Sequence, residues 1–302
     1  MVLFKFQFFK FDGICQTVAL TLCPLMGKFD GIEPMCYSRN VEFAGLLVFQ
    51  PATLMMDLAA ICMTSIMTYH VKTKYTAVGR KEIAMFFQLY LVTIFLEMLL
   101  VTNIIPTASI LYPFFTAAHI GLLSTCFWCL MLNGFVGFQF AEDGTPISLW
   151  VGTTNILWFG FIAMATFNNV GPFSYTSPTA LWIIYFIVNG FMFFIYTVSQ
   201  IILVAYTLDD RWPLGDIVFG ILFFVSGLVV MFIFSVALCE QVKHYLDGLF
   251  FGSMFNLLAV MMVYKYWDSI TKEDLEFSID SKHQAWEIQG LLNDEEIKVG
   301  KL

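Results

Sequence analysis

The sequence predicts an all-α polytopic membrane protein with seven transmembrane helices, a lumenal N-terminus and a cytoplasmic C-terminus. Three observations lead to this prediction. Hydrophobic residues make up 59% of the 302-residue chain and charged residues only 13%, which is about half the charged share of a soluble domain. The apolar residues gather into seven stretches, each long enough to cross a hydrocarbon core about 30 Å thick as a helix of roughly 20 residues. The connection after the first stretch is basic, which sets the orientation.

Most prolines of the chain fall between the apolar stretches and so mark their ends. Only Pro51 lies well inside a stretch, where we expect it to kink the first helix. The expected spans are 44–69, 83–105, 111–140, 147–169, 179–206, 214–238 and 246–266. Three regions follow: a lumenal N-terminal segment (1–43), a seven-helix membrane domain (44–266) and an acidic cytoplasmic tail (267–302), which we expect to be disordered. None of the pieces outside the spans is large enough for a soluble catalytic domain.

The orientation rests on basic residues in or beside the connection between the first two spans. These residues are Lys72, Lys74, Arg80 and Lys81. Short basic loops remain on the cytoplasmic side of a membrane. Because the number of spans is odd, the N-terminal segment then lies in the lumen and the tail in the cytoplasm.

Four of the seven cysteines lie on the predicted lumenal side: Cys15, Cys23, Cys36 and Cys239. An oxidising compartment permits disulfides, and four cysteines allow two bridges with three connectivities. The sequence does not choose among the three. The alternative is that some of the four are free thiols.

The first three predicted spans each contain an acidic residue or a histidine. Asp57 lies near the middle of the first span, whereas Glu97 and His119 lie at similar depth toward the lumenal ends of the second and third. A mid-helix charge costs about 2.5–3.5 kcal/mol in lipid, so such residues face the protein interior. We expect contacts between helices, with Glu97 and His119 as a pair. The alternative is the internal polar site of a seven-span receptor or transporter.

The histidines are too few for the usual catalytic zinc site. His70 and His283 lie on the predicted cytoplasmic side, and His119 and His244 on the lumenal side. A zinc site with an open position usually takes three protein ligands. A site of His119, His244 and Asp247 in an intramembrane metal hydrolase is a weaker alternative. The chain also lacks the common phosphate-binding and nucleophile motifs. We therefore predict a protein that is not an enzyme, with no cofactor, no metal and no nucleic-acid partner.

The last span carries the clearest helix-packing pattern. Gly248 and Gly252 are four residues apart and are followed by Ser253, so small side chains line one helix face. His244 and Asp247 lie on adjoining turns at the lumenal start of this span. These five residues form either a contact within the chain or a docking face for another membrane protein.

Several short strings are spread from the N-terminal segment to the tail. They are PMCYSRN at 34–40, KYTAVGRKE at 74–82, FFQLYL at 86–91, AEDGT at 141–145, KHYLDGLFFGS at 243–253, MMVYK at 261–265 and DLEF at 274–277. Together they resemble the fungal chitin synthase export chaperone family, and the match covers most of the chain. The strings at 243–253 and 74–82 are the most specific.

The resemblance implies a non-enzymatic chaperone in the endoplasmic reticulum membrane. Such a protein assists the folding or assembly of a chitin synthase, a multispanning client, and its export, and thereby supports cell-wall chitin synthesis. It also implies a multi-pass protein, with onward travel beside the client as an open alternative. In the basic loop, Tyr75, Gly79, Arg80 and Glu82 are candidates for contact with the client or for fixing the topology.

The tail contains an acidic pair with the spacing of an export signal. Asp274 and Glu276 are separated by one residue on the predicted cytoplasmic side. Vesicle coat proteins read di-acidic signals there, so they are candidate partners besides the client and the membrane lipid. Acidic triplets are also common in solvated tails, which is the alternative.

Overall fold

The computed structural model describes residues 8–27, 31–43, 45–74, 77, 79–136, 146–207 and 211–271. The regular secondary structure of this part of the chain is helical apart from one two-stranded hairpin. Its elements are α1 (Asp12–Thr17), η1 (Cys23–Leu25), β1 (Val41–Phe43), β2 (Leu46–Val48), α2 (Pro51–Thr73), α3 (Arg80–Val101), α4 (Tyr112–Val136), α5 (Pro146–Phe167), α6 (Thr179–Trp182), η2 (Ile183–Val188), α7 (Asn189–Thr207), α8 (Trp212–Val229), η3 (Val230–Phe234), α9 (Ser235–Gln241) and a last helix (Gly248–Thr271). The elements η2 and η3 are π-helical turns that interrupt longer helices.

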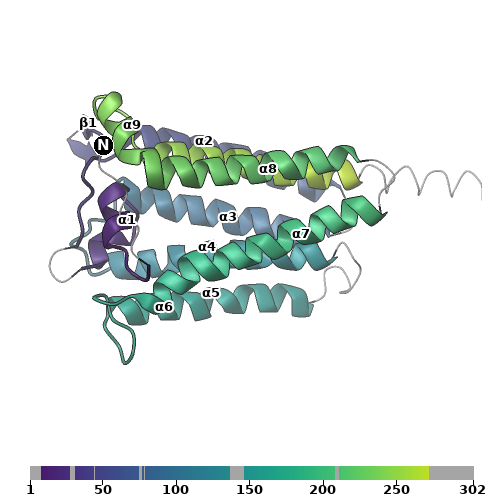
Figure 1. Cartoon of the computed structure of the whole chain (residues 1–302), viewed down its shortest axis with the longest axis horizontal. Coiled ribbons are helices and arrows are strands. Elements are labelled where there is room, and N and C mark those ends of the chain that lie inside the picture. The colour runs from purple at the N-terminus through teal and green to yellow at the C-terminus, as the bar shows by residue number, and fades with distance from the viewer. Residues whose placement is uncertain are drawn as a thin grey trace, which may run out of the picture.

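The described helices form one elongated bundle in which successive stretches run in opposite directions (Figure 1). The stretches are α2, α3, α4, α5, α6–η2–α7, α8–η3–α9 and the last helix. We call the end of the bundle that carries residues 8–50 the cap end. The opposite end, which the last helix reaches at Thr271, is the tail end.

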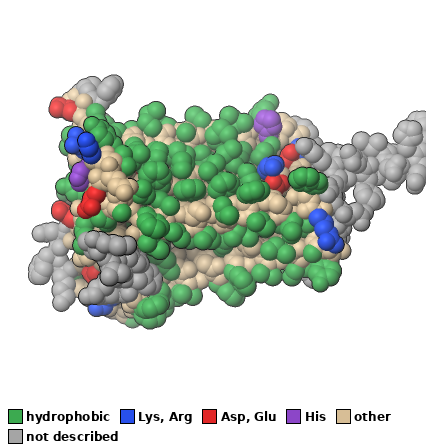
Figure 2. Space-filling model, turned by 45° about the horizontal axis from the view of Figure 1, so that its top comes forward, with side chains coloured by type: hydrophobic (Ala, Val, Ile, Leu, Met, Phe, Trp, Pro, Cys, Tyr) green, Lys and Arg blue, Asp and Glu red, His purple; other side chains and the backbone are tan. Residues whose placement is uncertain are grey.

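Six helices in the described part of the chain are long and apolar enough to cross a membrane. They are Pro51–Thr73, Arg80–Val101, Tyr112–Phe135, Thr179–Tyr206, Trp212–Gln241 and Gly248–Thr271. Figure 2 shows hydrophobic side chains over the middle of the bundle and charged side chains toward its two ends. The predicted all-helical architecture is therefore confirmed, with six candidate spans.

The first long helix begins later than the sequence predicts. Strands β1 and β2 form an antiparallel hairpin with Val41 opposite Val48, and α2 starts only at Pro51. Pro51 therefore occupies the first helical turn, where its missing N–H removes no helical hydrogen bond. The expected kink at Pro51 is wrong for this reason. At the other end of the chain, the last helix continues to Thr271, beyond the expected limit at residue 266.

The N-terminal segment folds back over the cap end. Phe11, Ile14 and Leu22 are each 1% exposed and belong to one hydrophobic cluster with Leu181 of α6 and Leu249 of the last helix. Burying large apolar side chains of this kind contributes about 1.5–3 kcal/mol each. The segment is thus part of the folded core at this end.

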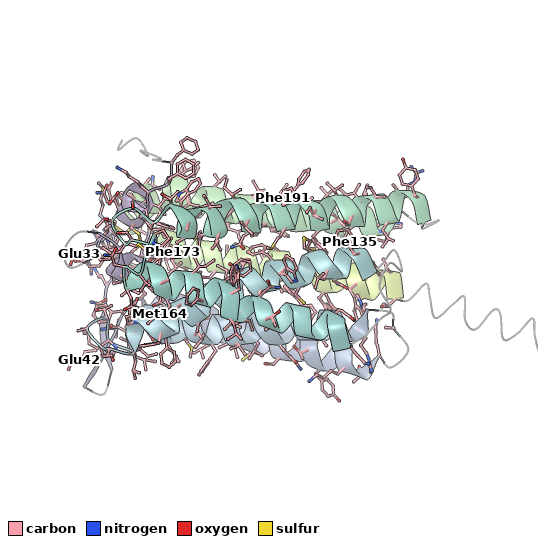
Figure 3. All side chains as sticks on the ribbon, turned by 90° about the horizontal axis from the view of Figure 1, so that it is seen from below. Glu33, Glu42, Phe135, Met164, Phe173 and Phe191 are labelled. Atoms are coloured by element: carbon pink, nitrogen blue, oxygen red, sulfur yellow. A yellow bond between two sulfur atoms is a disulfide. The ribbon has the colours of Figure 1, made fainter. Side chains whose placement is uncertain are left out.

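Burial ranks the helices from centre to periphery. Helix α4 contacts α3, α5 and α7, and 61% of the residues in its apolar part are buried. Only 11% of the residues in the apolar part of α8–η3–α9 are buried, so this stretch presents most of its apolar surface outward. Phe191 on α7 is also exposed, on the outer side of the bundle (Figure 3).

Candidate functional site

The three ionisable residues predicted inside the spans are neighbours near the cap end. His119 Nε2 of α4 lies 4.0 Å from Glu97 Oε2 of α3. Asp57 of α2 is 1% exposed and close enough to Glu97 for their carboxyl groups to interact electrostatically. The N-terminal segment at the cap end, which we call the cap, covers this cluster. Thr21 Oγ1 of the cap lies 3.3 Å from His119 Nδ1, and Tyr112 donates a hydrogen bond of 2.8 Å to the Thr21 carbonyl. The cluster therefore links three helices to the N-terminal segment.

The four predicted lumenal cysteines form two disulfides. Cys15 pairs with Cys23 inside the cap, and Cys36 pairs with Cys239 near the end of α9. The second bridge joins residues 203 positions apart. Closing so long a loop constrains the unfolded chain strongly. Of the three connectivities that the sequence allows, the structure shows this one.

A set of contacts around the second disulfide joins the N-terminal segment to the loop before the last helix. We call this set the cap junction; its residues are Cys36, Arg39, Cys239, His244 and Tyr245. The Arg39 N–H donates a hydrogen bond of 2.7 Å to the His244 carbonyl. The Arg39 guanidinium carbon lies 5.2 Å from the centroid of the Tyr245 ring, within cation–π range. Two of the quoted strings, 34–40 and 243–253, therefore meet here although they are distant in sequence.

The small residues of the last helix contact a helix of the same chain. A Cβ atom on Gly248 would lie 2.3 Å from Ser235 Oγ, and one on Gly252 would lie 2.8 Å from Met231 Sδ. The Gly248 N–H also donates a hydrogen bond of 3.1 Å to Ser235 Oγ. Ser253 is half-buried. The stretch α8–η3–α9 thus covers this face. Of the two alternatives that the sequence left open, the structure shows the contact within the chain.

Asp247 and His244 differ in environment although they are three residues apart. Asp247 is 2% exposed, whereas His244 is exposed. Burial raises the pKa of the Asp247 carboxyl, against the opposing effect of hydrogen bonds from the Phe250 N–H and the Thr53 side chain. The Phe250 N–H lies 3.1 Å from Asp247 Oδ1, so this carboxyl caps the last helix.

A second junction lies at the tail end, where the α2–α3 connection meets the last helix. We call it the tail junction; its residues are Lys74, Trp267, Asp268 and Thr271. Lys74 forms a salt bridge with Asp268. Its Nζ also lies 5.5 Å from the centroid of the Trp267 ring and 3.4 Å from Thr271 Oγ1. The basic loop is thereby attached to the end of the bundle.

The remaining candidates of the basic loop lie beside the tail junction. Gly79 has a φ of 69° immediately before α3, a left-handed conformation that glycine adopts without steric cost. Arg80 donates a hydrogen bond of 3.4 Å to the Lys72 carbonyl, and Glu82 is 1% exposed. Tyr75 lies outside the described residues, as do Asp274 and Glu276 of the tail.

Several residues of these sites carry no signal in the sequence. Thr21, Thr53 and Tyr112 are ordinary polar residues without a motif. Only the fold brings Thr21 beside His119, Thr53 beside Asp247 and Tyr112 beside the Thr21 carbonyl. Arg39 and Tyr245 at least lie within the quoted strings. Their pairing depends on a contact between distant segments, which no local pattern encodes.

One group of three possible metal ligands exists among the described residues: Cys36, Cys239 and His244, whose ligand atoms lie within 4.8 Å of one another. The set of His119, His244 and Asp247, which an intramembrane metal hydrolase would need, does not form such a group in this part of the chain. The ionisable residues described above instead connect helices, the cap and the connecting loops.

Together, the apolar bundle and its polar junctions define a helical membrane protein. Sequence comparison identifies the family. The sequence model of the chitin synthase export chaperone family matches residues 7–281. This chain belongs to that family.

Curated relatives carry the same description. The chitin synthase export chaperone of Cryptococcus neoformans is 48% identical over 291 residues, which cover 94% of this chain and 80% of that protein. The chaperone of Chaetomium globosum is 46% identical over 300 residues, covering 96% and 90%, and that of Coccidioides immitis is 46% identical over 299 residues, covering 96% and 90%. No solved structure matches the chain. These relatives are named as chaperones, and the chain is accordingly not an enzyme.

Proposed function

We propose that this protein is a chaperone of the endoplasmic reticulum membrane that assists a chitin synthase in folding or assembly and in export from that compartment. Membership of the chitin synthase export chaperone family over nearly the whole chain carries this proposal. The bundle fits such a role because its outward faces are apolar, while the pairs Glu97–His119 and Lys74–Asp268 are engaged in contacts within the chain. Apolar helices of this kind can pack against the unassembled helices of a multispanning client.

We further propose that the protein crosses the membrane seven times, with α5 as the seventh span. Helix α5 has 22 residues, enough for a hydrocarbon core about 30 Å thick. Its portion Thr154–Phe167 is apolar, with Leu157, Trp158 and Phe161 exposed. It also packs along α4 in the same bundle as the six candidate spans. If α5 crosses the membrane beside its neighbours, its exposed apolar face lies in lipid and not in water.

We propose that the cap end lies in the lumen and the tail end in the cytoplasm. Both disulfides lie at the cap end, and disulfides persist in oxidising compartments. Acidic side chains such as Glu33 and Glu42 also lie at this end (Figure 3). The basic residues of the α2–α3 connection lie at the tail end, in agreement with the positive-inside rule.

Deletion of the protein tests the proposed function. In a strain that lacks it, we expect a fluorescently tagged chitin synthase to accumulate in the endoplasmic reticulum and cell-wall chitin to fall. A second membrane protein with an unrelated route should reach the surface normally. The tagged synthase should also co-purify with this chain in mild detergent. Normal surface delivery of every chitin synthase in the deletion strain would overturn the proposal.

The tail offers a separate test of a contact with vesicle coats. We propose that Asp274 and Glu276 form a di-acidic export signal. The double variant D274A/E276A should slow delivery of the client, whereas D280A/E287A, which removes the same charge from the same tail, should not. Equal effects of the two variants would show that only the charge of the tail matters.

A further inference from the structure

The cap junction brings three metal-binding side chains together. Cys36 comes from the N-terminal segment, Cys239 from α9, and His244 from the loop that follows α9. His244 Nδ1 lies 3.1 Å from Cys36 Sγ and 3.8 Å from Cys239 Sγ. In the structure the two sulfurs form a disulfide, which does not bind metal ions in the way that thiolates do.

The backbone fixes the position of His244 beside Cys239. Helix α9 ends in a Schellman motif, in which the His244 N–H donates to the Cys239 carbonyl at 2.9 Å and the Lys243 N–H donates to the Glu240 carbonyl at 3.2 Å. Lys243 and His244 have φ angles of 54° and 66°, so the chain turns back sharply after the helix. This turn directs the imidazole toward the sulfur atoms.

These separations match those within a tetrahedral zinc site. Zinc–sulfur bonds of about 2.3 Å and zinc–nitrogen bonds of about 2.0–2.1 Å place a sulfur and a nitrogen about 3.6 Å apart and two sulfurs about 3.8 Å apart. The observed nitrogen–sulfur distances of 3.1 and 3.8 Å lie on either side of the first value. Only the distance between the two sulfurs must increase, from that of a covalent bond to that of a van der Waals contact.

The junction would stay assembled if the disulfide opened. The hydrogen bond from Arg39 N–H to the His244 carbonyl and the contact of Arg39 with the Tyr245 ring join the same two segments independently of the sulfurs. Cys36 and Cys239 are 5% and 0% exposed, which shields the site from bulk water. His244 is exposed, which gives an ion a path of entry.

We propose that Cys36, Cys239 and His244 form a binding site for a thiophilic divalent cation such as Zn²⁺ when the Cys36–Cys239 disulfide is reduced. A dithiol reductant breaks the S–S bond and is itself oxidised to a disulfide, and its two hydrogens protonate the two cysteine sulfurs. The cation then displaces both thiol protons to solvent and binds two thiolates and the neutral imidazole. Its fourth position is open on the exposed side. The metal thus replaces the disulfide as the link between the cap and the last loop.

The test uses the full chain, purified in detergent, in oxidised form and after reduction with a phosphine that is then removed. Bound zinc is measured per chain, and Co²⁺ replaces zinc to reveal thiolate ligands by their charge-transfer absorption. The reduced wild type should bind one zinc and the oxidised form none. The variant C36S/C239S should bind none. The matched variant C15S/C23S removes the other disulfide and should keep the site.

The histidine is tested with H244N, because asparagine tolerates a positive φ better than most residues and is a poor zinc ligand. Mass spectrometry of the oxidised variant should still show the Cys36–Cys239 bridge, which reports an assembled junction. We expect its reduced form to bind zinc at least tenfold more weakly than the wild type. Absence of zinc from the reduced wild type, or equal binding by C36S/C239S, would overturn the proposal. Unchanged affinity in H244N would remove the histidine from the site.

Discussion

Asp247 caps the last helix with a carboxyl group that is itself buried. Its carboxyl accepts a hydrogen bond from the Phe250 N–H while only 2% of its surface is exposed. Because burial raises its pKa, the folded state holds the proton more tightly than the unfolded chain. The stability that this group contributes is therefore present at low pH and is lost as pH rises through its folded-state pKa.

This sign predicts different behaviour for two variants of Asp247. Asparagine keeps the cap and removes the charge, so D247N should become more stable relative to the wild type as pH rises from 4 to 8. D247A also removes the charge but loses the cap as well, so it should be about 1 kcal/mol less stable than D247N at all these pH values. Thermal unfolding in detergent across this range provides the measurement. A D247N variant that loses stability relative to the wild type as pH rises would show that the folded state favours the charged carboxylate.

Gly248 provides a prediction about close packing. An alanine Cβ at this position would lie 2.9 Å from the Ser235 Cα, a backbone atom that cannot rotate away. G248A should therefore destabilise the protein by about 1–3 kcal/mol, the usual cost of overpacking. Unfolding in SDS titrations measures the change.

Gly190 supplies the matched control for this prediction. It also lies in a long helix, α7, but a Cβ there would meet nothing within 4 Å. G190A should leave stability unchanged or raise it by up to about 1 kcal/mol, because alanine favours helix over glycine. Similar losses in G190A and G248A would show that packing against Ser235 is not the cause.

Among the elements, the α2–α3 connection and the last helix are coupled through the tail junction. The Lys74 and Asp268 side chains are 24% and 23% exposed, so solvent screens their attraction only in part. Lys265 and Asp216 form a comparable pair at 2.9 Å, but the lysine is 64% exposed. Burial should therefore make the first pair the stronger of the two.

A double-mutant cycle tests this ranking. K74Q and D268N, alone and combined, should give a coupling energy of about 0.5–1 kcal/mol, and K265Q with D216N only a few tenths at most. The cycle cancels other contacts of each residue. Added salt should reduce both values. A larger coupling for Lys265 and Asp216 would contradict the argument from burial.

Element types follow from sequence wherever an apolar run is long enough to dictate them. The seven predicted stretches each correspond to a helical stretch of the bundle, because a chain in lipid satisfies its backbone through helical hydrogen bonds. The start of the first helix escaped prediction because the largely apolar strands β1 and β2 form a hairpin before Pro51. Hydrophobicity alone does not distinguish the two.

Contacts between elements depend on information that local patterns lack. The similar depth of Glu97 and His119 can be read from two helix lengths, and the structure places these residues 4.0 Å apart. Thr21 lies near His119, and Cys36 near His244, because of the way the N-terminal segment folds over the bundle. This segment has no hydrophobic periodicity from which its path could be predicted. Such positions are set by the whole core, including buried residues such as Phe11 and Leu22.

At the scale of the whole molecule, the two ends of the bundle differ in chemistry. The cap end is cross-linked by two disulfides and covered by the N-terminal segment, whereas the tail end joins its loop and last helix through a salt bridge. The proposed orientation accounts for this difference, because it places the disulfides in the oxidising lumen and the basic loop in the cytoplasm. Under this orientation, the chemistry of each end of the bundle matches the compartment that the end faces.

Introduced glycosylation sites test this orientation and the number of crossings. The chain has no Asn-x-Ser/Thr acceptor. E42T creates one at Asn40, an exposed residue of the cap, beside the position of Glu42 in Figure 3. Threonine also suits the strand at this position. E295T creates another at Asn293 in the tail. Acceptors are modified only in the lumen.

Each arrangement of the chain gives a different pair of results in this experiment. Seven crossings with a lumenal cap predict an endoglycosidase-sensitive shift in E42T and none in E295T. A shift in E295T alone would mean the inverted orientation. Shifts in both variants, or in neither, would mean an even number of crossings, so that one of the seven helical stretches does not span the bilayer. Because α5 alone lies outside the six candidate spans, it would be the stretch to reassign in that case.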